Sequence, residues 1–477
     1  MYIHNNRLGK PHFLFEMALP DVVTRGEGGM TAIHAGAALL SGGWAQDVRI
    51  VCDGGVVSSV ETGVSPERQD ERHAVIVSAM PNLHSHAFQR AMAGLAEIRG
   101  PADDSFWSWR TVMYKFALSM TPDHVEAVAA QLYMEMLEAG FGRVGEFHYL
   151  HNDRDGSHYG NIAEMAERIG AAAAQTGIGL TLLPVFYAHS GFGGQPPIDG
   201  QKRFIHSIDS YEKLMQGAQA VVKSLPGAAL GIAPHSLRAV TGDELAAIVP
   251  LAKDAPIHIH VAEQIKEVED SLAFSGARPV EWLLGNAPVD KRWCLIHATH
   301  MTQAEIRRMA RSGAVAGLCP VTEANLGDGV FPAPDFLAED GHFGVGSDSN
   351  ILISVSEELR TLEYSQRLSR RARNVIADAG SSTGEKLFQA ALEGGGGALM
   401  SESRIEKGKS ADLVALDISA VPYLPASKIL DQWLFAGNVR VDTVWVRGEK
   451  QVQAGQHIRR REISDRFNQV MAELLNS

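Results

Sequence analysis

The chain has little cysteine, an excess of acidic over basic residues, and no long hydrophobic run. Its 477 residues include only three cysteines, Cys52, Cys294 and Cys319, and none belongs to a Cys-x-x-Cys pair. Isolated cysteines are typical of reduced core residues, so we expect a cytoplasmic protein rather than a disulfide-stabilised one. No apolar run reaches the ~18 residues of a membrane span, and the first residues lack a secretory pattern.

The charge balance limits the kinds of partner. The 56 acidic and 43 basic residues give a formal net charge of −13. An acidic surface repels phosphate backbones and anionic bilayers, so neither nucleic acid nor a membrane is expected as a partner. An acidic small molecule remains compatible, because a local arginine can reverse the field inside a pocket. The length suggests one large α/β domain of ~250 residues or more and a smaller domain.

Short apolar runs alternate with amphipathic stretches through the middle of the chain. The eight runs cover residues 75–82, 143–151, 179–188, 230–235, 256–263, 293–300, 314–319 and 343–348. Thr121 and Pro122 have the pattern of a helix N-cap and first helical residue. Thr302 and Glu305 form the capping box of another helix. Eight strand–helix units predict an α/β fold, a (β/α)8 TIM-like barrel over residues 74–403.

The two ends of the chain share short β-type runs punctuated by glycine. Residues 30–73 and 404–457 therefore predict a small β-sandwich subdomain built from both ends. Residues 1–29 show little periodicity and predict a loosely ordered extension, and residues 458–477 predict a C-terminal helix. Four consecutive glycines at residues 394–397 favour a turn or hinge near the exit of the barrel.

Ligand-type residues stand at the ends of several runs. His84 and His86 end the first run, and residues two apart on a strand face the same side. His260 and Asp348 end later runs, and the carboxyl ends of barrel strands meet at one mouth. Three imidazoles and a carboxylate suit a divalent ion such as Zn2+, which lowers the pKa of a bound water to ~7. One ion is expected, because the run ending at His235 offers no lysine to bridge two metals.

Two of these assignments have competitors. His258 shares a strand face with His260, which is preferred because it forms a His-x-x-Glu unit with Glu263. His297 is the candidate for taking a proton from the water, and His300 competes with it. Glu263 is the candidate for delivering a proton to a leaving nitrogen, although an acidic residue there would also complement the dipole of the next helix.

Several longer segments carry a family resemblance. They are Met80-Pro-Asn-Leu-His-Ser-His-Ala-Phe-Gln-Arg90, Glu146-Phe-His-Tyr149, His189-Ser-Gly-Phe-Gly-Gly-Gln195, Ala233-Pro-His-Ser-Leu-Arg-Ala-Val240, His260-Val-Ala-Glu263, His297-Ala-Thr-His300, Thr322-Glu-Ala-Asn-Leu-Gly-Asp-Gly329, Gly346-Ser-Asp-Ser-Asn350 and Arg404-Ile-Glu-Lys-Gly-Lys-Ser-Ala-Asp-Leu-Val414. From about residue 35 to about residue 455 the chain resembles the amidohydrolase superfamily and, within it, the N-formimino-L-glutamate iminohydrolases (formimidoylglutamate deiminases). The metal motifs identify only the superfamily. The resemblance to the formimidoylglutamate deiminases rests on the Phe-His-Tyr, Gly-Phe-Gly-Gly and Glu-Ala-Asn-Leu-Gly-Asp-Gly segments.

The resemblance implies zinc-dependent hydrolytic deamination of N-formimino-L-glutamate, a step of histidine degradation. It implies one Zn2+ per subunit; the sequence does not exclude iron or another divalent ion, and relatives suggest a possible homodimer. The implied residues are His84, His86, His260 and Asp348 for the metal, His297, Glu263 and Asp348 for catalysis, and Gln89, Tyr149, His235 and Arg238 for the substrate, with Arg110 as a further candidate.

The chemistry of that substrate suits these residue types. It carries two carboxylates and an amidine-type carbon, and Arg238 can hold one carboxylate in a bidentate fork. Two alternatives remain open at this stage. A deaminase of guanine or an adenosine derivative would share the metal motifs but would need a pocket that stacks a flat ring. A non-catalytic binding or scaffold protein of the same fold would be expected to have lost some of these residues.

Overall fold

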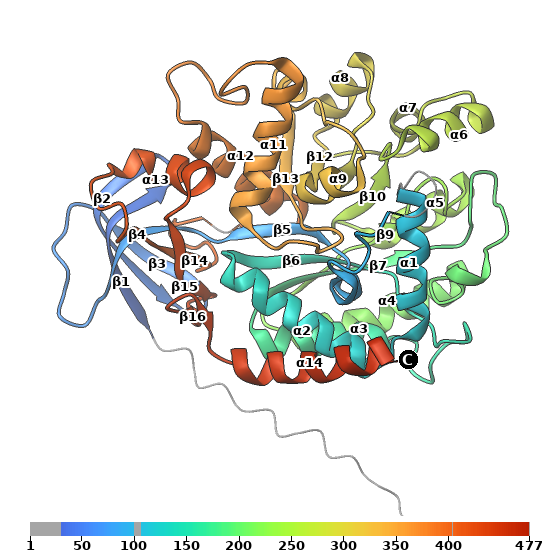
Figure 1. Ribbon diagram of the computed structural model, residues 1–477, viewed down its shortest axis with the longest axis horizontal. Helices are drawn as coiled ribbons and strands as arrows, with labels where there is room; N and C mark the ends of the chain where they lie inside the picture. The colour runs from blue at the N-terminus through green and yellow to red at the C-terminus, as the bar shows by residue number, and fades with distance from the viewer. Residues whose placement is uncertain (1–29, 100–105, 403, 477) are drawn as a thin grey trace, which may run out of the picture.

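Eight parallel strand positions form a barrel in the computed structural model, which describes residues 30–99, 106–402 and 404–476 (Figure 1). They are β5 (Met80–Ser85), β6 (Phe141–His148), β7 (Gly179–Phe186), β8 (Ala229–Leu230) with β9 (Ala233–Pro234), β10 (Ile257–Val261), β11 (Trp293–His297), β12 (Val315–Leu318) and β13 (His342–Val345). Single bridges connect the two hydrogen-bonded sheets: Ser236 pairs with His260, and Ser85 pairs with Asp348. Most of these strands are buried on both faces, which explains their continuous apolar runs. The parallel α/β architecture predicted from the repeats is confirmed.

Two observed strand positions differ from the expected runs. Residues 75–82 span the end of β4 (Glu71–Ser78), which belongs to another sheet, and the start of β5. Between them the backbone N–H of Ala79 donates to the carbonyl of Asp412 at 3.0 Å. Residues 230–235 are divided between β8 and β9. Hydrophobicity marks burial in both places, but it does not mark where a strand changes its hydrogen-bonding partner.

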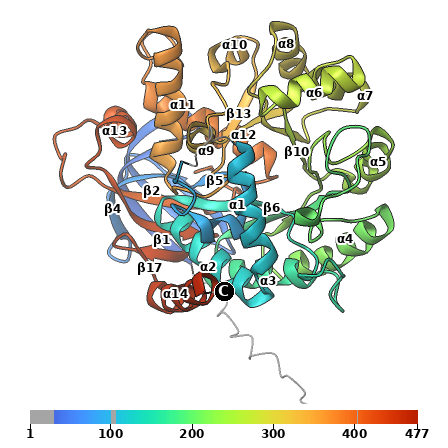
Figure 2. The ribbon, with the colours of Figure 1, turned by 45° about the vertical axis from the view of Figure 1, so that its right-hand side comes forward.

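Helices surround the barrel, and α1 (Phe106–Ser119) lies over its mouth (Figure 2). The others in this part of the chain are α2 (Pro122–Glu138), α3 (Glu164–Thr176), α4 (Ile208–Lys223), α5 (Gly242–Ile248), α6 (Ile265–Ser275), α7 (Pro279–Asn286), α8 (Gln303–Ser312), α9 (Pro320–Leu326), α10 (Ala333–Leu337), α11 (Val355–Arg370) and α12 (Thr383–Ala398). Thr121 caps α2, and Thr302 and Glu305 form the capping box of α8, as expected. Among the described residues, none of the helices is both long and apolar enough to cross a bilayer.

The four consecutive glycines lie inside α12, so the predicted turn or hinge at residues 394–397 is wrong. A Cβ on Gly394 would lie 2.0 Å from the carbonyl oxygen of Phe343, and one on Gly395 would lie 2.7 Å from Cγ of Pro81. These glycines therefore let α12 pack closely against β13 and β5. The prediction weighed the backbone freedom of glycine, whereas its missing side chain is what matters here.

Strands from both chain ends form one eight-stranded sheet beside the barrel, at the left of Figure 1. Its order is β17 (Gln456–His457), β16 (Glu449–Gln453), β15 (Arg440–Val446), β14 (Leu413–Asp417), β4, β1 (Thr31–Leu40), β2 (Gly43–Asp53) and β3 (Val56–Glu61). The two ends meet where β14 pairs antiparallel with β4. All eight strands follow one hydrogen-bonded path, so the expected sandwich is not confirmed.

The remaining parts of the chain complete this picture. The sheet reaches Ser78, beyond the boundary expected at residue 73. Helix α13 (Ile429–Asp431) precedes β15, and α14 (Arg460–Asn476) follows the last strand, within the range expected for a C-terminal helix. All three cysteines are free and buried. The extension expected at residues 1–29 lies outside the described residues.

Candidate metal centre and active site

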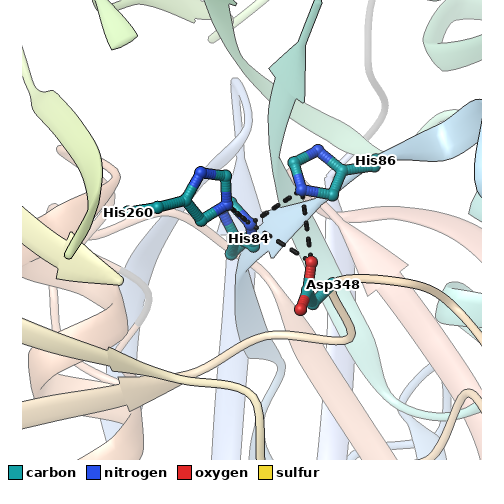
Figure 3. A group of neighbouring side chains, drawn as sticks. All are labelled: His84, His86, His260 and Asp348. Carbon is teal, nitrogen blue, oxygen red and sulfur yellow. Dashed lines mark hydrogen bonds and ion pairs between the residues drawn. The ribbon is translucent and has the colours of Figure 1, made fainter. Parts of the chain in front are cut away.

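Four side chains from three strand ends meet in one buried cluster (Figure 3). His84 lies on β5 with His86 just beyond it, His260 lies on β10, and Asp348 follows β13. The Nε2 atom of His84 is 3.2 Å from Nε2 of His86 and 3.0 Å from Nε2 of His260. Oδ1 of Asp348 is 3.4 Å from Nε2 of His84 and 3.2 Å from Nε2 of His86. Ligands at about 2.0 Å from a tetrahedral ion stand roughly 3.3 Å apart, so this spacing fits a small divalent ion.

Backbone carbonyls determine which imidazole nitrogens face the centre of the cluster. His86 Nδ1 donates to the carbonyl of Phe147 at 3.0 Å, and His260 Nδ1 donates to the carbonyl of His235 at 3.0 Å. Each neutral ring then carries its proton on Nδ1 and directs the lone pair of Nε2 inward. Lone pairs converging in a buried site repel one another unless a cation lies between them. The donor set therefore fits a metal ion.

The electrostatics of the cluster give His84, His260 and Asp348 the protonation states that a metal requires. Burial, with the neighbouring His86 acting in the same direction, lowers the pKa of His84 to about 3 against the opposing effect of Asp348. Burial, followed by the nearby imidazoles, also lowers the pKa of His260 well below its ordinary value. Burial alone would raise the pKa of Asp348, but its contacts with His84 and His86 outweigh burial and hold it well below the usual range. Neutral imidazoles and an ionised carboxylate are the forms that bind metal.

The structure separates the competing histidines. His258 is fully buried, and its Nε2 pairs with the carbonyl of Ala398 at 2.8 Å, away from the cluster. His300 Nε2 pairs with the carbonyl of Asp328 at 2.9 Å. His260 and His297 are instead the members of each pair that adjoin Asp348 and the cluster.

His297 and Glu263 lie close together beside the cluster. Nε2 of His297 is 3.9 Å from Oε1 of Glu263 and 3.8 Å from Oδ2 of Asp348. Burial opposes the charged form of His297, but Glu263, Glu323 and Asp348 outweigh it and raise the pKa to about 10. Burial raises the pKa of Glu263, with opposing effects from His297 and Arg238. A basic imidazole beside a carboxyl of raised pKa is suited to moving protons in both directions.

The backbone is strained at the strand ends that carry these groups. Ala262, His297 and Asp348 have φ values of 53°, 67° and 47°, in the left-handed region that non-glycine residues rarely adopt. They follow or end β10, β11 and β13. Strain of this kind, about 1–3 kcal/mol per residue, persists where the surroundings over-determine the conformation and clusters at functional sites.

A cavity of about 640 Å³ opens above the cluster. All five residues predicted to bind substrate line it: Gln89, Tyr149, His235, Arg238 and Arg110. Gln89 Nε2 donates to the hydroxyl of Tyr149 at 2.7 Å. Burial raises the pKa of Tyr149 well above its usual value, and burial together with Arg238 lowers that of His235 well below its own. Both groups are therefore neutral and can donate a directed hydrogen bond.

Two guanidinium groups flank one indole in the lining of the cavity. The guanidinium carbon of Arg238 lies 5.9 Å from the ring centre of Trp107, and that of Arg110 lies 4.6 Å from it. Arg238 is half-buried, its Nη2 is 3.6 Å from Oε2 of Glu263, and its Nε has no hydrogen-bond partner among the described residues. Paired guanidinium groups with donors to spare are suited to holding a carboxylate.

Sequence reasoning missed three buried carboxylates behind the site. Glu323 accepts from His297 Nδ1 at 3.2 Å, Glu267 accepts the backbone N–H of Glu263 at 3.1 Å, and Glu146 accepts a backbone N–H after the His-x-His segment at 2.7 Å. Glu146 and Glu323 lie in segments that carried the family resemblance, and that was the available signal. Glu267 offered none, because one turn into a helix it looks like an ordinary solvated acid.

Comparison with known proteins agrees with this geometry. Residues 75–450 match the amidohydrolase family, and residues 30–74 match the N-terminal domain of formimidoylglutamate deiminase HutF. The chain is 49% identical over 455 residues to formimidoylglutamate deiminase of Pseudomonas aeruginosa, covering 94% of this chain and 100% of that protein. It is 25% identical to 5-methylthioadenosine/S-adenosylhomocysteine deaminase of Natronomonas pharaonis, covering 80% and 82% of the two chains.

Solved structures extend the comparison. The crystal structure of an amidohydrolase from Brucella melitensis superposes with a TM-score of 0.92 at 58% identity, covering 93% of this chain and 100% of that one. An adenosine deaminase from Xanthomonas campestris with bound zinc gives a TM-score of 0.78 at 23% identity over 94% and 99% of the two chains, which shows a shared fold. The chain belongs to the amidohydrolase family and, within it, to the formimidoylglutamate deiminases.

Proposed function

We propose that this chain hydrolyses N-formimino-L-glutamate to N-formyl-L-glutamate and ammonia, in the degradation of histidine. One observation carries the proposal: a cavity of about 640 Å³ holds a four-donor metal centre together with two arginines beside one indole. The 49% identity to a formimidoylglutamate deiminase supports the same reaction.

We infer that one zinc ion per chain occupies the centre. Three imidazole nitrogens and one carboxylate oxygen at tetrahedral spacing are a donor set that zinc favours. Iron(II) binds similar donors, so metal analysis decides between them. When bound, the ion supplies Lewis-acid activation of water at neutral pH.

The protein residues beside the centre carry the proton transfers. Asp348 is ionised and is placed to take the proton that the attacking water loses, and His297, which its raised pKa keeps protonated, stands 3.8 Å from Asp348 and orients the water. Oxygen then bonds to the formimino carbon. Glu263 delivers a proton to the nitrogen as the carbon–nitrogen double bond opens. Asp348 then passes the proton that it took to the same nitrogen, the remaining carbon–nitrogen bond breaks, and ammonia leaves, while the hydroxyl proton of the new carbonyl oxygen returns to Glu263. The raised pKa of Glu263 favours the protonated form that its first step needs.

The two carboxylates of the substrate have separate partners. Arg238 and Arg110 hold one of them where both guanidinium groups approach Trp107. Gln89, Tyr149 and His235 are placed to direct hydrogen bonds to the other. This division leaves the formimino group between the carboxylates and the metal centre.

The alternatives find less support. Identity to a 5-methylthioadenosine/S-adenosylhomocysteine deaminase is 25%, against 49% to a formimidoylglutamate deiminase. A non-catalytic scaffold would not need four donors with inward lone pairs and a strained backbone. A cytoplasmic location and a homodimer remain predictions from the sequence.

A substrate comparison tests the proposal. Purified protein of measured metal content is incubated with N-formimino-L-glutamate, and ammonia and N-formyl-L-glutamate are quantified. We expect both products in equal amounts, and much slower ammonia release from adenosine, 5-methylthioadenosine and guanine. Faster release from any of these purines would overturn the assignment.

A further inference from the structure

The seventh barrel strand, β12, contributes none of the four metal donors, yet the residues that follow it contact the site groups of both neighbouring strands. Thr322 and Glu323 lie in the first turn of α9 and are 0% and 5% exposed. The hydroxyl of Thr322 donates to the carbonyl of Ser347 at 3.1 Å and accepts from the backbone N–H of Ser349 at 3.3 Å. Ser347 and Ser349 flank Asp348, so Thr322 holds the segment that presents this ligand.

Glu323 makes the corresponding contact with the sixth strand. Its Oε1 accepts from His297 Nδ1 at 3.2 Å and from the backbone N–H of Cys319 at 2.9 Å. The second bond holds the carboxylate in one position, and the first sets the orientation of the imidazole. With Nδ1 occupied by Glu323, Nε2 is the ring nitrogen that faces Asp348 and Glu263.

We propose that Glu323 is a positioning residue for His297 and that Thr322 plays the same part for the Asp348 segment; this rests on the proposed function. His297 ends its strand with φ at 67°, so the regular strand geometry does not orient its ring. A carboxylate behind a working histidine fixes both the ring and the proton-bearing nitrogen. Without Glu323 the ring can rotate, and Nε2 then no longer faces Asp348 and Glu263.

Glu358 provides a matched control. It is another fully buried carboxylate that supports the start of α9, where it accepts the backbone N–H of Val321 at 3.0 Å. No hydrogen bond or ion pair links it to His297 within the described part of the chain. A purely structural requirement for a carboxylate under α9 would affect Glu358→Gln as strongly as Glu323→Gln.

The test compares Glu323→Ala, Glu323→Gln, Glu358→Gln and Thr322→Val with wild type. For Glu323→Ala we expect kcat to fall roughly 10- to 100-fold, the scale of groups that orient active-site ligands, with KM within twofold and the bound metal retained. Glu323→Gln keeps an acceptor oxygen and should recover part of that loss. Glu358→Gln should lower the melting temperature and leave kcat within twofold. Thr322→Val should weaken metal retention instead.

Crystal structures of the metal-loaded Glu323→Ala and wild-type proteins supply a readout that is independent of turnover. We expect a rotated His297 ring in the variant. Unchanged kcat or an unrotated ring in Glu323→Ala would overturn the inference, as would an equal loss of kcat in Glu358→Gln and Glu323→Gln. If wild type releases no ammonia from N-formimino-L-glutamate, the proposed function fails, while the ring orientation still decides the role of Glu323.

Discussion

The metal centre and the arginine pair of the cavity are built differently. At the metal centre, donors such as His84 and His260 belong to barrel strands and are almost fully buried. In the arginine pair, Arg110 lies on α1, Arg238 lies beyond β9, and both are half-buried. Strands hold the groups that must meet within about 3 Å, whereas helices and loops hold the groups that recognise the rest of the substrate. Substitutions should therefore separate into those that abolish chemistry and those that weaken binding.

The largest loss of activity is expected at the metal centre, from His260→Ala. The variant should lose its bound ion and more than about a thousandfold in kcat, because the Lewis acid is gone. Metal analysis and ammonia release measure the two losses. The control is His258→Ala, on the same strand and equally buried but paired with the carbonyl of Ala398. Retention of metal by the first variant and its loss from the second would reverse the assignment.

His297→Asn should separate proton transfer from metal binding. His297 is not one of the four donors, so the ion should stay bound while kcat falls by about 10²- to 10⁴-fold, the usual contribution of a general acid or base. Steady-state kinetics with parallel metal analysis provide the check. Near-normal turnover would remove His297 from the chemistry.

In the arginine pair, Arg238→Ala should raise KM and leave the metal in place. A charged hydrogen bond contributes about 1.5–3 kcal/mol, which corresponds to a roughly 10- to 100-fold rise. Arg110→Ala should also raise KM, because its guanidinium flanks the same indole. Loss of the ion from Arg238→Ala would mean that substrate binding by the arginines cannot be separated from metal binding.

The smallest effects concern the scaffold that brings the strand-borne donors together. Gly394→Ala would place Cβ 2.0 Å from the carbonyl of Phe343 on β13 and should destabilise the protein by about 1–3 kcal/mol. Gly397→Ala, in the same helix but with no described atom within 4 Å of its Cβ, should stabilise it by about 0.5–1 kcal/mol. Chemical denaturation of both variants measures the difference. Equal effects would show that α12 does not need its close approach to the barrel.

The same contrast explains what the sequence could predict. His84, His86 and His260 could be grouped because strand periodicity and the common mouth of a barrel are regular, and the capping box of Thr302 is a local signal. Contacts between side chains of neighbouring strands produce no local pattern in the sequence. The bond from His297 to Glu323 joins residues 26 positions apart in sequence, and the packing of Gly394 on Phe343 joins distant segments. Local patterns predicted a turn at those glycines and missed Glu323.

The central claim is that one divalent ion lies among His84, His86, His260 and Asp348. Anomalous diffraction from crystals of the zinc-loaded protein, recorded on both sides of the zinc absorption edge, tests it most directly. The account predicts one strong peak per chain, at about 2.0 Å from an Nε2 atom of each histidine and from a carboxylate oxygen of Asp348. A peak elsewhere, or none in active crystals, would contradict it.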